Sequence, residues 1–319
     1  MDLSENQNIF PLQTPEEHES YKFYQRQQAT LWVMQAIDFT KDIPDYNTVS
    51  NEERLLLEYI LGFFAVGDAL VIENINRRFM DDSPLKPDKL FLNAQAYIEG
   101  VHAEVYGRWV EVFVPDRTHQ NQIFKMAGTA NAVRLKAEWV NRWIVSDESV
   151  ALRFFAFACT EGIFFSVLFA IIFWFHSRGK FISFAFSNEE ISKDEGIHRD
   201  YGAMRYRRHR QHGDDARAIQ IMQEAVAIEF EFISEILPVD LGDLTQESLR
   251  QYAMSVADSL LKECGILPFY RAKNPFPFMD MISLGRKTNF HELAVGNYRM
   301  DRPGGKTEND GYKPEEVDF

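Results

Sequence analysis

The sequence contains two Glu-x-x-His patterns, Glu99/His102 and Glu195/His198. In an α-helix, residues three positions apart lie about 60° apart around the axis, so each pattern places a carboxylate and an imidazole on one helix face. Tyr106 follows His102 by one turn, close to the direction of Glu99. Apolar residues flank the first pattern, and an inward helix face seldom carries such groups unless something binds them. Two patterns in one helical chain suggest a pair of metal ions.

Two further carboxylates lie inside apolar helical segments. Asp68 lies between Val66 and Val71, and Glu161 is the main ionisable residue of the segment 154–175. A lone aspartate within a helix usually faces solvent. Because nearly all the neighbours of Asp68 are hydrophobic, a paired or metal-bound carboxylate is favoured.

The segment 154–175 is long enough to cross a membrane. A carboxylate within it would be costly in lipid, and Arg153 and Arg178 bracket it. We therefore expect a helix buried all round at the centre of a soluble bundle, with Glu161 as its functional residue and no membrane as a partner.

The rest of the chain is typical of an all-α protein. Three capping boxes are expected, at Thr14/Glu17, Ser50/Glu53 and Ser187/Glu190. Helices are expected over 14–32, 50–79, a segment around Glu99 ending near 114, 119–145, 154–175, a segment from 187 through 198, 214–237 and 245–264, with a connection over 41–49. We expect an N-terminal arm over 1–13, one helical domain over 14–299 and a flexible tail over 300–319.

Composition excludes several classes of function. The net charge of −14 argues against nucleic acid as a partner. The two cysteines, Cys159 and Cys264, form no Cys-x-x-Cys pattern, which argues against a disulfide framework or a cysteine zinc site. Cysteine usage and the absence of a signal-like N-terminus predict a cytoplasmic protein.

The four acidic segments match the ferritin-like di-metal bundle, which takes one carboxylate from each of two helices and a Glu-x-x-His from each of the other two. The predicted fold is therefore all-α, a ferritin-like helical bundle. Its predicted metal ligands are Asp68, Glu99, His102, Glu161, Glu195 and His198. Four carboxylates offset two divalent cations. Oxygen-rich ligands with one imidazole per metal suit iron or manganese better than structural zinc.

These residues closely resemble the small subunit of class I ribonucleotide reductase. The resemblance rests on Phe-Phe-Ala-Val-Gly-Asp68, Glu99-Gly-Val-His-Ala-Glu-Val-Tyr106, Glu161-Gly-Ile-Phe-Phe-Ser and Glu195-Gly-Ile-His198. It implies a homodimer with two iron ions that react with dioxygen. Manganese in one or both positions is the alternative. The implied activity is ribonucleoside-diphosphate reduction for deoxyribonucleotide biosynthesis and DNA replication, carried out with a large catalytic subunit.

The same resemblance implies roles for individual residues. Tyr106 would be oxidised to a stable radical, in an apolar pocket that Phe165, Phe169 and Ile191 are positioned to wall. Trp32 and Asp194 match the relay that carries the oxidising equivalent outward from His102. Tyr298 matches the tail tyrosine that delivers it to the large subunit, with Tyr312 as a rival. The C-terminal Glu-Glu-Val-Asp-Phe319 resembles the peptide that docks on that subunit.

Two other functions use the same scaffold. A stand-alone di-metal oxidase or oxygenase would turn over without a partner and would not need the tail. A ferritin-like storage protein would not require Tyr106, Trp32 or a docking tail. One departure from the family pattern is Lys193, where many relatives have arginine.

Overall fold

The computed structural model describes residues 10–280, apart from the side chains at 65, 66 and 68–70. Within that range the regular elements are helical, which confirms the all-α prediction. The α-helices are α1 (Pro15–Ala29), α2 (Ile43–Thr48), α3 (Asn51–Asn74), α4 (Lys86–Phe113), α5 (Arg117–Thr129), α6 (Asn131–Ile144), α7 (Val150–Cys159), α8 (Ser166–Ser177), α9 (Ile182–His209), α10 (Asp214–Ile236) and α11 (Gln246–Glu263). The π-helix η3 (Ile75–Phe79) follows α3, and the π-helix η4 (Thr160–Phe164) joins α7 to α8. A short 3-10 helix, η2, spans Met34–Ala36.

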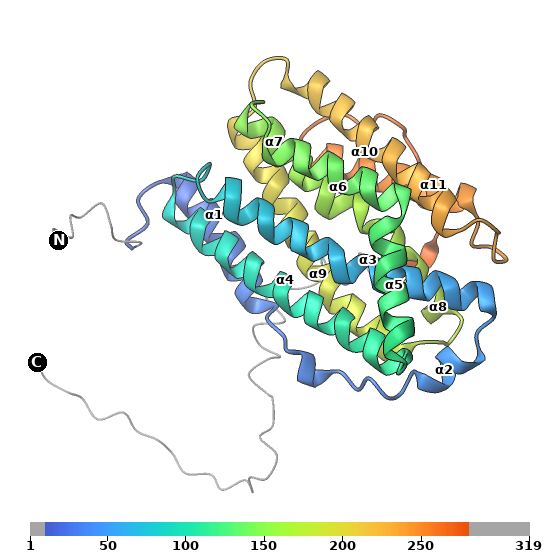
Figure 1. The fold of residues 1–319 in the computed structure, drawn as a ribbon. Helices are drawn as coiled ribbons and strands as arrows, with labels where there is room; N and C mark the ends of the chain where they lie inside the picture. Colours follow the sequence, from blue (N-terminus) through green and yellow to red (C-terminus); the bar gives the residue numbers. More distant parts are fainter. Residues whose placement is uncertain (1–9, 281–319) are drawn as a thin grey trace, which may run out of the picture.

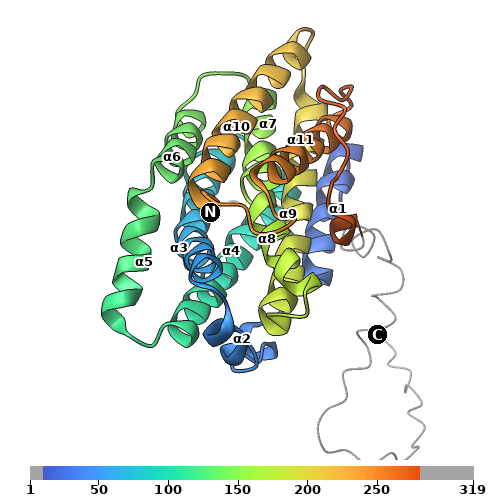
Figure 2. The ribbon, with the colours of Figure 1, turned by 90° about the vertical axis from the view of Figure 1, so that its right-hand side faces the viewer.

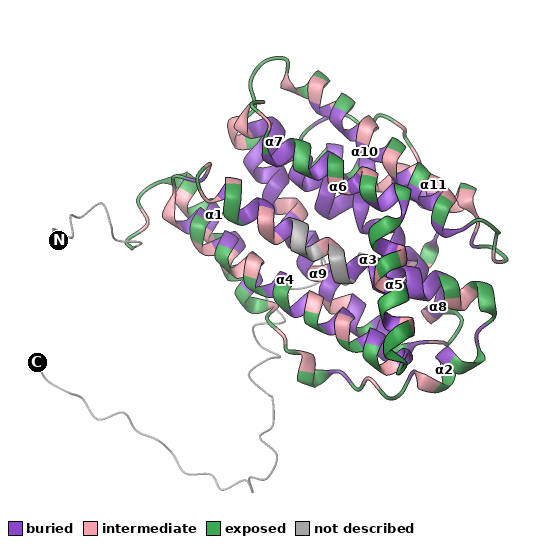
Figure 3. Ribbon diagram, in the orientation of Figure 1, coloured by how far each residue is buried: buried purple, intermediate pink, exposed green. Residues whose placement is uncertain are grey.

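The long helices lie side by side in a bundle (Figures 1 and 2). Helix α7 packs along α9, α3 along α4, and α1 along α4 and α9, while α10 packs against α6, α7 and α11. Buried residues follow the inward faces of the helices, and exposed residues follow their outer faces (Figure 3). This packing brings α4, η4 and α9, which carry the predicted Glu and His ligands, into the interior.

The apolar segment 154–175 forms the centre of the bundle, as predicted. Val150–Ser177 is the one stretch of the described residues that is long and apolar enough to cross a membrane, and its most apolar part is completely buried in the protein. It is not a continuous α-helix, because the π-helix η4 interrupts it at Thr160–Phe164. The interruption falls at Glu161. Single π-helical turns within α-helices are frequent at functional sites.

Two of the three predicted capping boxes are confirmed, at Thr14/Glu17 and Ser50/Glu53. The third, at Ser187, is wrong because α9 begins five residues earlier, at Ile182. The start of α9 is capped from a distant part of the chain, where Asp42 accepts the backbone N–H groups of Ser183 and Phe184. A sequence pattern cannot reveal a cap supplied by a residue so far away.

Three other boundaries differ from prediction. The segment 119–145 is two helices, because Ala130 leaves the helical conformation and separates α5 from α6. The expected connection over 41–49 contains the short helix α2. The first helix ends at Ala29, so Trp32 lies in the turn after α1. The predicted division of the chain at residues 14 and 300 stays a prediction, since 300–319 lies outside the described residues.

Candidate metal centre

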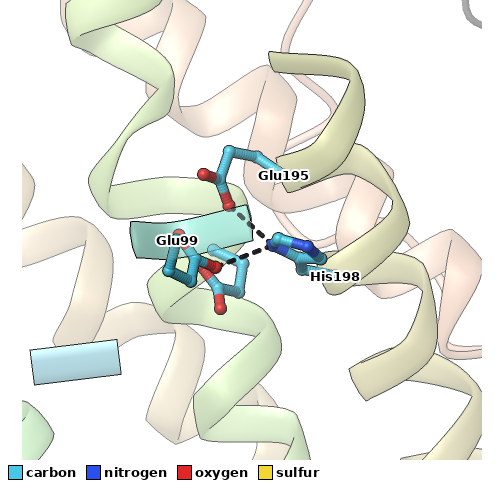
Figure 4. Close-up of side chains that lie close together, drawn as sticks. Glu99, Glu195 and His198 are labelled. Carbon is cyan, nitrogen blue, oxygen red and sulfur yellow. Dashed lines mark hydrogen bonds and ion pairs between the residues drawn. The ribbon is translucent and has the colours of Figure 1, made fainter. Parts of the chain in front are cut away.

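Four of the predicted ligands meet at one point in the interior. Glu99 on α4, Glu161 on η4, and Glu195 and His198 on α9 each place one ligand atom within 4.8 Å of the others. All four side chains are buried. In Figure 4 the carboxylates of Glu99 and Glu195 point at the imidazole of His198 from two different helices. The Glu-x-x-His spacing therefore places these groups where the sequence predicts them.

His102 completes a symmetrical arrangement around two shared carboxylates. Its Nδ1 lies 3.2 Å from Glu99 Oε2 and 3.1 Å from Glu195 Oε1. The Nδ1 of His198 lies 3.0 Å from Glu99 Oε1 and 3.1 Å from Glu195 Oε2. Each of the two carboxylates thus turns one oxygen toward each imidazole. This donor set suits two cations that each have an imidazole and share the glutamates between them.

Asp68, the sixth predicted ligand, lies in α3, but its side chain is outside the described part of the structure. The backbone of α3 comes close to the end of η4 beside it. A Cβ atom at the neighbouring Gly67 would lie 3.3 Å from the ring of Phe165. The absence of a side chain at Gly67 therefore allows α3 to approach the segment that carries Glu161.

Buried charge controls the protonation of the centre. Burial alone would lower the pKa of His198, but the carboxylates of Glu99 and Glu195 outweigh it and raise that pKa to about 9. The pKa of His102 is also raised well above its usual value, because Asp194, Glu195 and Glu99 outweigh burial. Burial opposes ionisation of Glu195, yet both imidazoles hold its pKa at about 2. The cluster therefore favours positive charge at its centre, as a cation site requires.

A hydrogen-bonded chain leads outward from His102. Its Nε2 lies 3.1 Å from Asp194 Oδ2, and the indole N–H of Trp32 donates to the same oxygen at 2.9 Å. The rings of Trp32 and His102 are nearly parallel, with centroids 6.0 Å apart. Trp32 is half-buried, whereas Asp194 and His102 are fully buried. The three residues of the predicted relay thus form one continuous path from the ligands toward the surface.

Two buried glutamines that sequence reasoning missed hold these groups in place. Gln27 donates to Asp194 Oδ1 at 2.8 Å, and its carbonyl oxygen lies 3.0 Å from Nε2 of His198. Gln95 donates to Glu161 Oε1 at 2.9 Å. Gln95 lies four residues before Glu99, so helical spacing could have assigned it to the ligand face. No spacing signal identifies Gln27, because it comes from a different helix, α1. Partners of this kind fix the orientation of metal ligands.

Tyr106 lies in the core on α4, one helical turn beyond His102. Its side chain is completely buried, and its hydroxyl donates to Asn188 Oδ1 at 2.7 Å. Phe64 stacks on the phenol with ring centroids 4.2 Å apart, and Phe165 and Phe169 pack against Phe64 in turn. Phe64, which the sequence did not single out, therefore stacks directly on Tyr106, and the predicted Phe165 and Phe169 contact Phe64. Ile191 is buried in the same core, as expected, while Tyr298 and Tyr312 lie outside the described residues.

A small cavity of about 140 Å³ reaches Glu161 and Glu195 on the side of the site that faces α11. Ser192 and Arg199 of α9 and Ser255 of α11 are among the residues that line it. Polar side chains thus form part of its lining. The cavity approaches the centre through η4, α9 and α11, whereas the path through Asp194 approaches it from the turn after α1.

Comparisons with known proteins identify the family of the chain. The family model described as "Ribonucleotide reductase, small chain" matches residues 8–275. The chain belongs to this family. It is 39% identical over 292 residues to a ribonucleoside-diphosphate reductase small chain of Arabidopsis thaliana, covering 91% of this chain and 87% of that protein. It is 36% identical over 320 residues to the small chain of Variola virus, covering 99% of each.

Solved structures give the same result for the fold. The ribonucleotide reductase Rnr4 homodimer from Saccharomyces cerevisiae superposes with a TM-score of 0.79 at 28% identity, covering 92% of this chain and 89% of that one. A dimanganese(II)-NrdF from Streptococcus sanguinis matches with a TM-score of 0.77 at 16% identity, covering 84% and 96%. These findings confirm the family and the ferritin-like bundle. As a small chain of ribonucleoside-diphosphate reductase, the protein is an oxidoreductase subunit, and radical generation is the role of this family.

We expect the metal-free protein to lose stability as the pH rises from about 6.5 to about 9. The pKa of His198 is about 9 in the folded state, against 6.5 as its ordinary value. Its protonated form therefore stabilises the fold fully below pH 6.5, and this contribution disappears as the pH rises through 9. The effect is of the order of 3 kcal/mol. Denaturant titration of chelator-treated protein across this pH range measures it.

His198→Gln should reduce the loss of stability between pH 6.5 and pH 9, whereas His209→Gln on the same helix should leave this loss unchanged. Burial lowers the pKa of His209, so its titration falls below this range. An equal loss of stability with rising pH in wild type and His198→Gln would contradict the electrostatic account of the centre.

Proposed function

We propose that two divalent cations bind between Glu99, His102, Glu195 and His198, with Glu161 and Asp68 as the outer carboxylates. The observation that carries this proposal is that Glu99 and Glu195 each turn one oxygen toward each imidazole. In such a site each imidazole would serve one cation, and Glu99 and Glu195 would each have one oxygen available to each cation. Metal binding displaces the protons that the imidazoles otherwise carry, so cation affinity rises with pH.

The ligand chemistry favours two iron ions, with manganese in one or both positions as the alternative. Carboxylate oxygens with a single imidazole per metal suit both elements. When bound, an iron pair together with dioxygen supplies the oxidising power for removal of one electron from Tyr106. The cavity that reaches Glu161 and Glu195 offers an approach for dioxygen or for metal ions.

The protein holds and protects the phenol of Tyr106. The hydrogen bond to Asn188 fixes the orientation of its hydroxyl. Stacking on Phe64 and complete burial exclude water and external reductants from the ring. In this proposal Tyr106 carries the stable radical, and His102, Asp194 and Trp32 form the inner part of the path by which the oxidising equivalent leaves the site.

Beyond the described residues, the proposal follows the family. Tyr298 delivers the oxidising equivalent to the large catalytic subunit, and residues 313–319 dock on that subunit. The chain acts as a homodimer in the cytoplasm. Ribonucleotides bind to the large subunit, and the small subunit supplies the radical on which their reduction depends.

Replacing Tyr106 by phenylalanine tests the assignment of the radical. We expect Tyr106→Phe to bind metal as wild type does but to give no tyrosyl EPR signal after addition of iron(II) and oxygen. Reductase kcat, measured with the large subunit, should fall by at least about 100-fold. Tyr206→Phe on α9 is the matched control, because Tyr206 is equally buried and its hydroxyl donates to Asp215 instead. Full reductase activity in Tyr106→Phe would refute the assignment.

A stand-alone di-metal oxidase is the second candidate, and the cavity at Glu161 is the feature that favours it. Deletion of residues 313–319 separates the two functions. The reductase requires activity to collapse while metal content and the radical signal remain, and a free peptide of these seven residues should inhibit the intact enzyme. A stand-alone oxidase would keep its full activity after the deletion. Unchanged reductase activity after the deletion would rule out docking through the tail.

A further inference from the structure

A second group of buried charges lies in the core beside the metal centre. Lys136 on α6 is 3% exposed and Glu229 on α10 is completely buried. The ammonium of Lys136 lies 2.7 Å from Glu229 Oε2. In the described part of the chain, no other group donates a hydrogen bond to this carboxylate. Glu229 therefore serves as the counterion of Lys136 alone.

The same ammonium reaches the segment that carries Glu161. Lys136 Nζ donates to the backbone carbonyl of Phe164 at 2.8 Å. Phe164 is the last residue of η4, where the hydrogen-bond register of the π-helix returns to that of α8. The preceding carbonyl, of Ile163, accepts a hydrogen bond from the hydroxyl of Ser166 at 2.8 Å. Side chains thus bond both carbonyls at the point where the backbone ladder changes register.

Aromatic rings tie this cation to the elements that carry the two outer carboxylates of the proposed site. Lys136 Nζ lies 3.5 Å from the ring centroid of Phe232, 4.8 Å from that of Phe63 and 5.2 Å from that of Phe164. Phe63 belongs to α3, the helix of Asp68, and Phe164 belongs to η4. Cation–π contacts of this kind are strongest where the cation is removed from water.

The pair is a poor source of net stability. Burial lowers the pKa of Lys136 to about 8, against the opposing effect of Glu229, and raises the pKa of Glu229 to about 7, against that of Lys136. Both groups thus resist ionisation in this environment. Replacing a buried ion pair by apolar residues of similar volume is often neutral or even stabilising. What the pair supplies here is a directed donor at one backbone carbonyl.

We propose that Lys136 is a positioning residue for the metal centre: its ammonium, held by Glu229, fixes the end of the π-helix η4 and thereby directs Glu161 at the cations. This inference rests on the proposed function, because Glu161 must be a metal ligand. In this inference Lys136, which is not a metal ligand, controls the position of the Glu161 carboxylate. Loss of the donor lets η4 relax toward a regular helix and turns Glu161 away from Glu99 and Glu195.

The test compares Glu229→Gln with the double variant Lys136→Met/Glu229→Gln, which differs from it only in the loss of the ammonium. Manganese(II) is titrated into metal-free full-length protein, and free ion is counted by EPR. We expect Glu229→Gln to bind two ions with a Kd within about threefold of wild type. The double variant should show at least a tenfold higher Kd for one of them, the lower end of the usual effect of partners behind a ligand.

Ile123→Ala on α5 is the control for general loss of stability. Ile123 is buried and packs on Gly62 of α3, and the truncation costs about 2–5 kcal/mol. It should lower Tm without changing the Kd for manganese. If the Lys136–Glu229 pair were purely structural, its loss would likewise change Tm while the folded protein kept its affinity for manganese. If the double variant does not fold, Lys136→Met/Glu229→Met replaces both charges by apolar groups and is measured instead.

The outcomes separate this inference from the proposed function. Wild type that binds neither manganese(II) nor iron(II) at these residues refutes the proposed function. Wild type that binds two ions, together with a folded Lys136 variant of unchanged Kd, refutes the role of Lys136 and leaves the metal centre standing. A higher Kd in the double variant, with the Kd of Glu229→Gln close to that of wild type, supports the inference.

Discussion

Carboxylates buried in the core are the constraint on which the rest of this structure depends. Glu99, Glu161 and Glu195 are between 0% and 5% exposed in the centre of an aromatic-rich bundle. Removing one such ion from water costs several kcal/mol, and the cost is offset only by opposite charge and well-directed hydrogen bonds. Two imidazoles supply part of this compensation, and the proposed cations would supply the rest. The packing of α4, η4 and α9 makes sense as the frame that holds these charges together.

The surroundings of the centre differ on its two sides. Toward α1, hydrogen-bonded polar groups continue from His102 through Asp194 to the half-buried Trp32. Toward α3, Phe64 stacks on Tyr106, and the hydroxyl of Tyr106 donates to the amide oxygen of Asn188. A stable radical needs isolation, whereas its eventual use needs a connection. Under the proposed function, the fold provides both around the metal site.

Much of the site could be predicted from sequence because its ligands follow helical spacing. The Glu-x-x-His pairs and Glu161 lie where their patterns place them, and the apolar segment around Glu161 is the buried centre. The partners from other elements could not be predicted in this way. Gln27, Asn188 and Lys136 are single polar residues whose role depends on contacts far along the chain.

The wrong predictions about the fold have the same origin, because they too concern contacts with residues far along the chain. The cap on α9 comes from Asp42, more than one hundred residues earlier, so the local pattern at Ser187 was misleading. The π-helix at Glu161 has no local sequence signature, and Lys136 of another helix donates to the carbonyl of its last residue, Phe164. Local propensity predicts where helices occur. Where they begin, break or change register depends on distant side chains.

Anomalous diffraction from crystals grown with iron(II) or manganese(II) tests the central claim most directly. The account predicts two peaks per chain, each beside one imidazole, with Glu99 and Glu195 between them. A single peak, or ions bound only at surface carboxylates while Glu99, Glu195, His102 and His198 keep contact with one another alone, would contradict it.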